Sequence, residues 1–207
     1  MIITRRSLTG WLLVAMLLLN VVGFAQNDNQ VVADPARTDN PVVAILEPQF
    51  GSVLIRDLEG FHEFTFSAPF DKIETILNLV VMQEWYPTYI SISCRPDEKA
   101  AIIMRASISK NAASERFAML QQLVTPGLLP WKTGELNNES PAVTAVETDF
   151  SSRVSVLGQT LKSGLIFTQL FPMLQRAPGI RDPFFERGSY RDSPSGRLME
   201  FSVKCNW

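Results

Sequence analysis

The sequence predicts an α+β fold in which two β-α-β-β units form a ferredoxin-like antiparallel sheet with helices on one face. Three observations predict it. Several segments alternate apolar and polar residues with the period of a half-buried strand. Other segments repeat apolar residues at helical spacing. The order strand, helix, strand, strand then occurs twice along the chain, in units that share length and element order rather than residues.

The first unit, with an additional helix, is predicted within residues 45–124. Residues 62–67 alternate with a period of two and predict a strand. The helix that follows carries one apolar stripe, made by Ile73, Ile76, Leu77 and Val80. Residues 88–94 and 100–109 alternate again and predict an antiparallel pair. A short helix over residues 112–124 completes this part of the chain.

The second unit is predicted over residues 151–207, after an irregular, proline-containing connection at 125–150. Its strand, helix, strand and strand are expected at 153–158, 163–175, 180–190 and 198–207. Because the last strand reaches the C-terminus, a truncation before Phe201 is expected to unfold this unit.

The N-terminal segment, residues 1–25, indicates export. Two arginines precede an apolar run, no charged residue follows until Asp28, and Gly23 and Ala25 suit a cleavage site. The segment is therefore a signal peptide or a retained membrane anchor, and its start fits either the general or the twin-arginine route. In both cases the rest of the chain is expected outside the cytoplasm, in the periplasm, secreted or anchored in the inner membrane.

Composition narrows the class of protein. The chain has 207 residues, of which 46% are hydrophobic, and its net charge is -2. Removing residues 1–25 takes away two arginines, which leaves 17 basic and 21 acidic residues and a net charge of -4. An acidic chain argues against nucleic acid as a partner. Residues 26–44, rich in Asn, Asp and Pro, are expected to form a flexible linker.

The residues that usually carry catalysis are scarce. The single histidine, His62, stands beside Glu63 in a predicted strand, where neighbouring side chains point to opposite faces. The sequence contains no CxxC pair and no glycine-rich phosphate loop. It therefore predicts a protein that is not an enzyme, with no catalytic, cofactor-binding or metal site.

The remaining candidate residues suit structure and contacts. Cys94 and Cys205 are expected to form a disulfide, with two buried thiols as the alternative. Aromatic side chains are candidates for a protein interface if they are exposed, and otherwise belong to the core. These candidates are Trp85, Tyr86, Trp131, Phe184, Phe185 and Trp207.

Four runs carry a resemblance to a known family: residues 153–160 (RVSVLGQT), 169–174 (QLFPML), 178–180 (PGI) and 199–205 (MEFSVKC). Together with the N-terminal apolar segment and the linker, they resemble the inner-membrane assembly-platform proteins of type IV pilus and type II secretion systems. The resemblance implies a ferredoxin-like periplasmic domain and a non-enzymatic scaffold that pairs with a similar partner. The chain departs from this family in lacking a heptad-bearing coiled coil after the membrane segment.

The expected function is therefore that of an exported structural or scaffold protein in a bacterial envelope assembly of the pilus or secretion type. It would act through protein–protein contacts with another envelope protein or as a homodimer, and would contact the inner membrane if residues 1–25 are retained. The alternative is a soluble periplasmic or secreted module that binds a small or peptide ligand between the two units.

Overall fold

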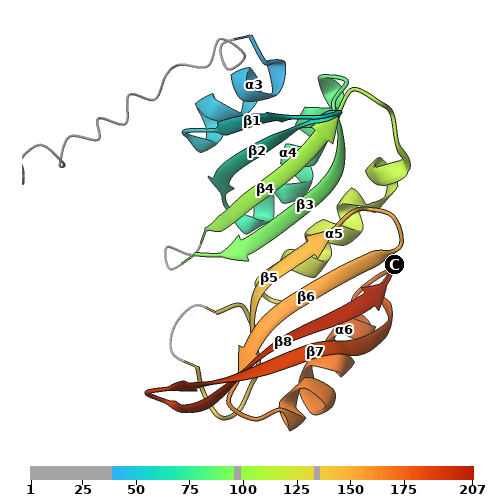
Figure 1. Ribbon diagram of the computed structural model, residues 1–207. Helices are drawn as coiled ribbons and strands as arrows, with labels where there is room; N and C mark the ends of the chain where they lie inside the picture. Colours follow the sequence, from blue (N-terminus) through green and yellow to red (C-terminus); the bar gives the residue numbers. More distant parts are fainter. Residues whose placement is uncertain (1–38, 96–98, 133–135) are drawn as a thin grey trace, which may run out of the picture. The chain divides into compact units, whose positions relative to one another are not determined.

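The computed structural model describes residues 39–95, 99–132 and 136–207. In these residues the chain forms one antiparallel sheet of eight strands, in the order β1-β2-β4-β3-β5-β6-β8-β7 (Figure 1). The predicted signal peptide or anchor, and residues 26–38 of the predicted linker, lie outside the described residues. Within the described ranges, no helix is both long enough and apolar enough to span a membrane.

The first half of the sheet is formed by the segment that ends with β4. Its elements are α3 (Pro41–Phe50), β1 (Leu54–Leu58), β2 (Phe61–Ala68), η2 (Phe70–Lys72), α4 (Ile73–Met82), β3 (Tyr86–Cys94) and β4 (Ala100–Ser107). Helix α4 connects β2 to β3, and β4 returns between these two strands. The order in space is therefore β1-β2-β4-β3.

The second half repeats this arrangement. Its elements are η3 (Ala112–Arg116), α5 (Phe117–Val124), β5 (Ala142–Thr148), β6 (Arg153–Thr160), η4 (Ile166–Leu170), α6 (Phe171–Arg176), β7 (Arg181–Ser193) and β8 (Gly196–Asn206). Element η4 is a π-helical turn directly before Pro172, which has no amide hydrogen to continue an α-helical ladder. The strand order is β5-β6-β8-β7, so β8 is an interior strand.

The two halves join where β3 pairs with β5. The register places Ile90 opposite Thr148 and Ile92 opposite Val146. The predicted ferredoxin-like fold is therefore wrong, because the strands form a single eight-stranded sheet rather than a small sheet built from two β-α-β-β units. The ferredoxin-like domain that the family resemblance implied is absent from the described residues for the same reason.

Strand β5 lies where the sequence predicted an irregular connection. A bulge between Val143 and Ala145 shifts its register against β6, so the buried residues Val143 and Val146 are three positions apart. This spacing removes the period of two on which strand prediction depends. A bulge of this kind cannot be recognised before the pairing partner is known.

Helix α3 begins inside the segment predicted to be a linker. The side chain of Asn40 accepts hydrogen bonds from the amides of Val42 and Val43, and Pro41 occupies the first turn. Gly51, with a φ of 83°, ends the helix. Because Pro48 lies within the helix and the apolar residues follow no regular stripe, the sequence pattern did not reveal it.

The sheet has one face covered by helices. The strand residues that point to this face are buried, among them Phe64, Ile102, Ile92, Val156 and Val203. Helices α3, α4, α5 and α6 contribute buried side chains to the core on that side, and α4 and α6 are seen behind the strands in Figure 1. The side chains that alternate with this buried set point away from the helices, and we call the surface they form the open face.

Candidate functional site

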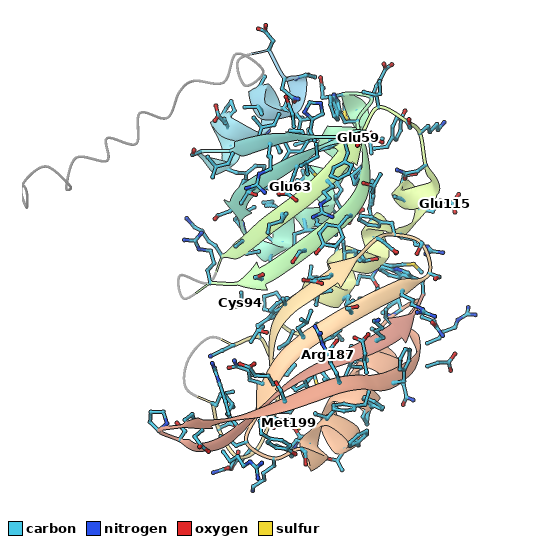
Figure 2. The ribbon with its side chains drawn as sticks, viewed as in Figure 1. Glu59, Glu63, Cys94, Glu115, Arg187 and Met199 are labelled. Atoms are coloured by element: carbon cyan, nitrogen blue, oxygen red, sulfur yellow. The ribbon has the colours of Figure 1, made fainter. Side chains whose placement is uncertain are left out.

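The open face extends across all eight strands. A single row of paired residues crosses it, comprising Leu54, Thr65, Ile103, Ser91, Glu147, Ser155, Lys204 and Phe184. Glu63 lies on this face in the first half and Arg187 in the second (Figure 2). The face is the main candidate for function because the described helices leave it uncovered.

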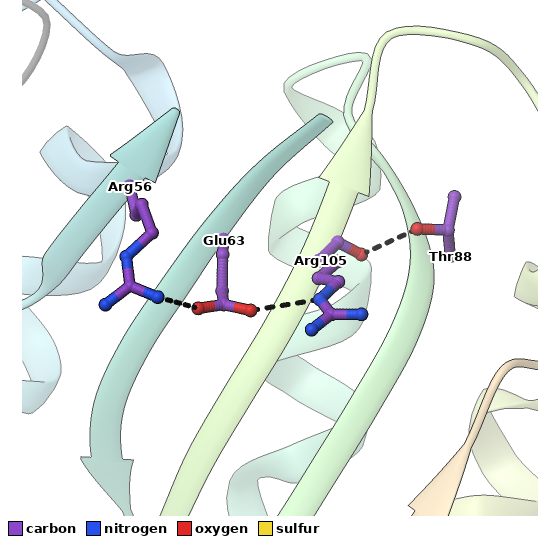
Figure 3. A network of polar contacts seen from close by, with 4 residues as sticks. All are labelled: Arg56, Glu63, Thr88 and Arg105. Atoms are coloured by element: carbon purple, nitrogen blue, oxygen red, sulfur yellow. Dashed lines mark hydrogen bonds and ion pairs between the residues drawn. The ribbon is translucent and has the colours of Figure 1, made fainter. Parts of the chain in front are cut away.

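The first half of the open face is occupied by an ion-pair ladder. Glu63 accepts a hydrogen bond from Arg105 Nε at 2.9 Å, and Arg56 Nη1 lies 3.5 Å from its other oxygen (Figure 3). The guanidinium of Arg105 also lies 4.9 Å from the ring centroid of Tyr89 and 5.5 Å from that of Phe61. These contacts fix the Arg105 side chain, so this part of the face is already paired internally.

The seam between the halves carries a second polar contact. Ser91 Oγ on β3 donates a hydrogen bond to Glu147 Oε1 on β5 at 3.4 Å. Burial, followed by the charge of Glu147, raises the pKa of the nearby Tyr89 hydroxyl. The polar groups of the two halves therefore meet directly across the β3·β5 pair.

The second half of the open face carries two networks. Lys132 Nζ donates to Gln159 Oε1 at 2.9 Å, Gln159 Nε2 donates to Glu200 Oε1 at 3.2 Å, and Arg191 Nε lies 3.2 Å from the same oxygen. The second network centres on the Glu186 carboxylate, which pairs with two residues of β8, Lys204 and Ser202.

Both partners of Glu186 act on its ionisation. The ammonium of Lys204 donates to one carboxylate oxygen and the hydroxyl of Ser202 donates to the other, the latter at 2.9 Å. The hydrogen bond from Lys204, followed by that from Ser202, lowers the pKa of the Glu186 carboxyl. Glu186 is therefore held ionised on the rim of the open face.

A hollow of about 480 Å³ lies over β5, β6, β8 and β7. The backbone of Gly158, Phe201 and Gly188, which pair in one row, forms part of its lining. Open-face side chains surround it, namely Thr144, Leu157, Gln159, Arg187, Ser189, Glu200 and Ser202. The size suits a small molecule or one side chain of a bound peptide together with its neighbours.

A second hollow, of about 350 Å³, lies beside the turn between β5 and β6. Arg116 Nη1 donates to the carbonyl of Phe150 at 3.1 Å and to that of Ser151, and its guanidinium lies 5.8 Å from the Trp207 ring. The Phe150 ring packs 5.5 Å from that of Phe117 on α5. These contacts fasten the turn to the helix layer, so this hollow has a structural explanation.

The two cysteines are not bonded to each other. Cys205 on β8 pairs with Val154 on β6, which pairs with Thr148 on β5, which in turn pairs with Ile90 on β3. Cys94 lies four residues beyond Ile90 along β3. Three strand spacings and the distance along β3 separate the thiols by on the order of 20 Å. The predicted disulfide is therefore wrong, and Cys205 is a buried thiol whose pKa is raised to about 12 by burial.

Most of the aromatic interface candidates pack against the core. Trp131 is buried 4.8 Å from the Phe70 ring, Trp85 packs against the core, and the Trp207 indole donates to Thr148. Phe185 packs partly against the core and Tyr86 is half-buried, which leaves Phe184, 42% exposed, as the candidate at the surface of the open face.

His62 has a neighbour that the sequence did not indicate. Its Nδ1 contacts Asp57 Oδ1 across the β1–β2 hairpin, and its ring lies 4.6 Å from that of Trp85 in an edge-on arrangement. Among the described residues, no group of three or more His, Cys, Asp or Glu side chains could hold a metal ion.

No protein-family model matches the chain, and neither the curated proteins nor the solved structures contain a significant match to it. A function is therefore inferred from the open face itself. Sequence reasoning did not select Gln159, Glu200 or Arg187 as site residues. Only the strand register brings these three residues around one hollow.

Proposed function

We propose that this protein is a non-enzymatic, exported binding domain that holds a protein partner on the open face of its sheet. The observation that carries this proposal is the one-sided packing of the described helices, which leaves a face of polar and apolar side chains uncovered across eight strands. Its side chains are fixed by the contacts of Glu63, Arg105 and Glu200, so little conformational entropy would be lost on binding.

The edges of the sheet are less suited to binding than its face. Strand β1 is five residues long, and β7, although 13 residues long, carries two register shifts and Pro183. Bulges and proline disfavour the addition of a further strand. A partner is therefore expected to lie across the face rather than extend the sheet.

The place of action follows from the N-terminal sequence. Residues 1–25 favour export, which supports a role as a scaffold in an envelope assembly whose partner is another envelope protein. The intact mass of the exported protein tests this part of the proposal. A mass that begins at Gln26 indicates a released domain, a full-length mass in the membrane fraction indicates an anchor, and retention in the cytoplasm contradicts both.

Site-specific photo-crosslinking tests the binding face. A photoreactive phenylalanine replaces Ser155 on the open face, and in a matched control it replaces Gln122, which is exposed on α5 in the helix layer. After irradiation of intact cells, we expect a discrete adduct with one envelope protein from position 155 and none from position 122. Adducts from position 122 alone, or none from the open face, would overturn the proposal.

The hollow favours a second function, in which the domain binds a small or peptide ligand without belonging to an assembly. Its volume of about 480 Å³ and its polar lining support this alternative. Native mass spectrometry of the purified protein separates the two functions. A monomer that carries a small constant extra mass supports the ligand-binding module, whereas a complex with a second envelope protein supports the scaffold.

A further inference from the structure

We propose that the hollow over β5, β6, β8 and β7 is a carboxylate-binding subsite that takes an acidic side chain from an extended segment of the partner. The inference rests on the proposed function and specifies the chemistry of the partner. Three observations support it: the balance of charge around the hollow, the orientation of its polar groups and the contrast with the first half of the sheet.

The charge around the hollow is positive, although the chain as a whole is acidic. Arg187 lines the hollow and forms no ion pair with any described carboxylate at contact distance, although its charge helps to lower the pKa of the adjacent Glu186; Arg191 is paired with Glu200. Lys132 adds a further cation through its hydrogen bond to Gln159. When the neighbouring Glu186 and its partner Lys204 are included, four cations face two carboxylates, and an anion would reduce the positive excess.

The polar groups of the hollow are already oriented. Gln159 uses its oxygen to accept from Lys132 and its nitrogen to donate to Glu200, which fixes the amide plane. The Glu200 carboxylate is held by Gln159 and Arg191, so its charge is compensated before any ligand binds. Arg187 is consequently the guanidinium whose donors remain for a ligand, and its planar fork matches a carboxylate.

At the equivalent place in the first half the paired strand residues are small and neutral, and the charged group that reaches them, Arg95, lies beyond the end of β3 and donates a hydrogen bond to Ser67 Oγ at 2.9 Å. Strand β6 ends with the pair Thr160 and Met199, and its counterpart in the first half, β2, ends with the pair Ala68 and Ala100. One step before these pairs, the second half has Gln159, Glu200 and Ser189, and the first half has Ser67, Ala101 and Ser93. The same strand pairing thus forms with small neutral residues, so Gln159 and Glu200 are not required for the pairing of the strands.

A carboxylate fits the hollow better than a phosphate group. Glu200 lines the hollow, and Glu186 lies beside Arg187 and is held ionised. Both would repel a dianion more strongly than a singly charged carboxylate. The uncovered sheet beside the hollow is accessible to an extended chain, whose alternate side chains would point toward the face.

Fluorescence anisotropy with defined peptides tests this inference on the protein purified from its exported fraction. The probes are a fluorescein-labelled, C-terminally amidated decapeptide of alternating Glu and Ser, and the same peptide with Gln in place of Glu. A Gln peptide with a free C-terminal carboxylate forms a third arm, which distinguishes a terminal carboxylate from an acidic side chain. We expect the Glu peptide to bind about tenfold more tightly than the amidated Gln peptide.

The variants R187Q and R181Q identify the site. Both remove an exposed arginine from β7, but position 181 lies outside the hollow. We expect R187Q to weaken binding of the Glu peptide about tenfold, because one charge-assisted contact is lost, and R181Q to change it less than about twofold. Matching thermal midpoints of the two variants exclude a loss of folding as the cause.

Equal binding of the Glu and Gln peptides, or equal effects of R187Q and R181Q, would overturn the subsite. If open-face photo-crosslinks to a partner persist in that case, the proposed function survives and the carboxylate chemistry alone is wrong. If the crosslinks are absent as well, both the function and the subsite are wrong. Tighter binding of the peptide with the free terminus would reassign the ligand from an acidic side chain to a chain end.

Discussion

Glu63 is the carboxylate that organises the first half of the open face. Its side chain is 12% exposed and lies between Arg56 and Arg105, and the second of these also packs on Tyr89. A charged group this enclosed stabilises the fold only while its partners remain in place. The ladder could not be predicted from the sequence, because its members come from strands whose order in space differs from their order in the chain.

The substitution E63Q is expected to destabilise the domain by about 1–2 kcal/mol, because a neutral amide replaces the acceptor of two charged donors. The control is D71N, since Asp71 pairs with Lys72 at the exposed surface and its loss is expected to cost less than about 0.5 kcal/mol. Urea unfolding of both variants measures the difference. Equal effects would show that the ladder contributes no more than a surface pair.

Gly158 is required by close packing. A Cβ atom at this position would lie 2.4 Å from the Phe201 ring and 2.5 Å from the carbonyl oxygen of Ala142. We expect G158A to lower the free energy of unfolding by about 1–3 kcal/mol, since the ring or the backbone must move. At Gly164 no atom lies within 4 Å of the added Cβ, so G164A is the matched control and should leave the thermal midpoint near that of the parent protein.

The buried thiol of Cys205 gives a direct test of the cysteine assignment. Burial raises its pKa to about 12, so it stays protonated and unreactive while the domain is folded. Iodoacetamide is expected to modify Cys205 only after unfolding, and without any reductant. A requirement for reductant in the unfolded protein would instead establish a disulfide, and rapid modification of the folded protein would contradict its burial.

At the scale of elements, regular periodicity determined what could be predicted. Strands β2, β3, β4, β6 and β8 coincide with the segments that alternate in sequence, and the segment predicted as a helix before residue 124 contains α5. The predictions for β5 and α3 failed for physical reasons. A bulge disrupts the alternation of β5, and the capping contacts of Asn40 start a helix whose apolar residues form no stripe.

The β7–β8 hairpin should give part of the stability a dependence on pH. Hydrogen bonds from Lys204 and Ser202 lower the pKa of Glu186 in the folded state from its ordinary value of 4.5. The folded state therefore binds this proton less readily than the unfolded chain. The contribution of Glu186 is present above pH 4.5 and is lost as the pH falls through the lower, folded-state pKa.

The variant E186Q should consequently be less stable than the parent protein at about pH 7, and the difference should narrow toward about pH 3. The control is E59Q, in which the substituted residue is exposed in the β1–β2 turn. Thermal midpoints of the three proteins across this range provide the measurement. A constant difference between E186Q and the parent protein would show that the Lys204 and Ser202 contacts do not act through ionisation.

For the molecule as a whole, the pairing of β3 with β5 turns two similar four-stranded halves into one sheet with a single open face. The repeated element order was visible in the sequence, but the assembly of the repeats was not. Periodicity reports which face of a strand is buried and carries no information about which other strand lies beside it. The hollow could not be predicted from the sequence for the same reason, because its lining comes from four strands, β5, β6, β7 and β8.

The continuity of the sheet is the central claim, since the open face across eight strands depends on it. A nuclear Overhauser spectrum of the isotope-labelled protein tests it most directly at the β3·β5 seam. We predict backbone proton contacts between Ile90 and Thr148 and between Ile92 and Val146, as the register requires. Contacts confined to β1–β4 and to β5–β8, with none across the seam, would contradict a single sheet and the binding face built on it.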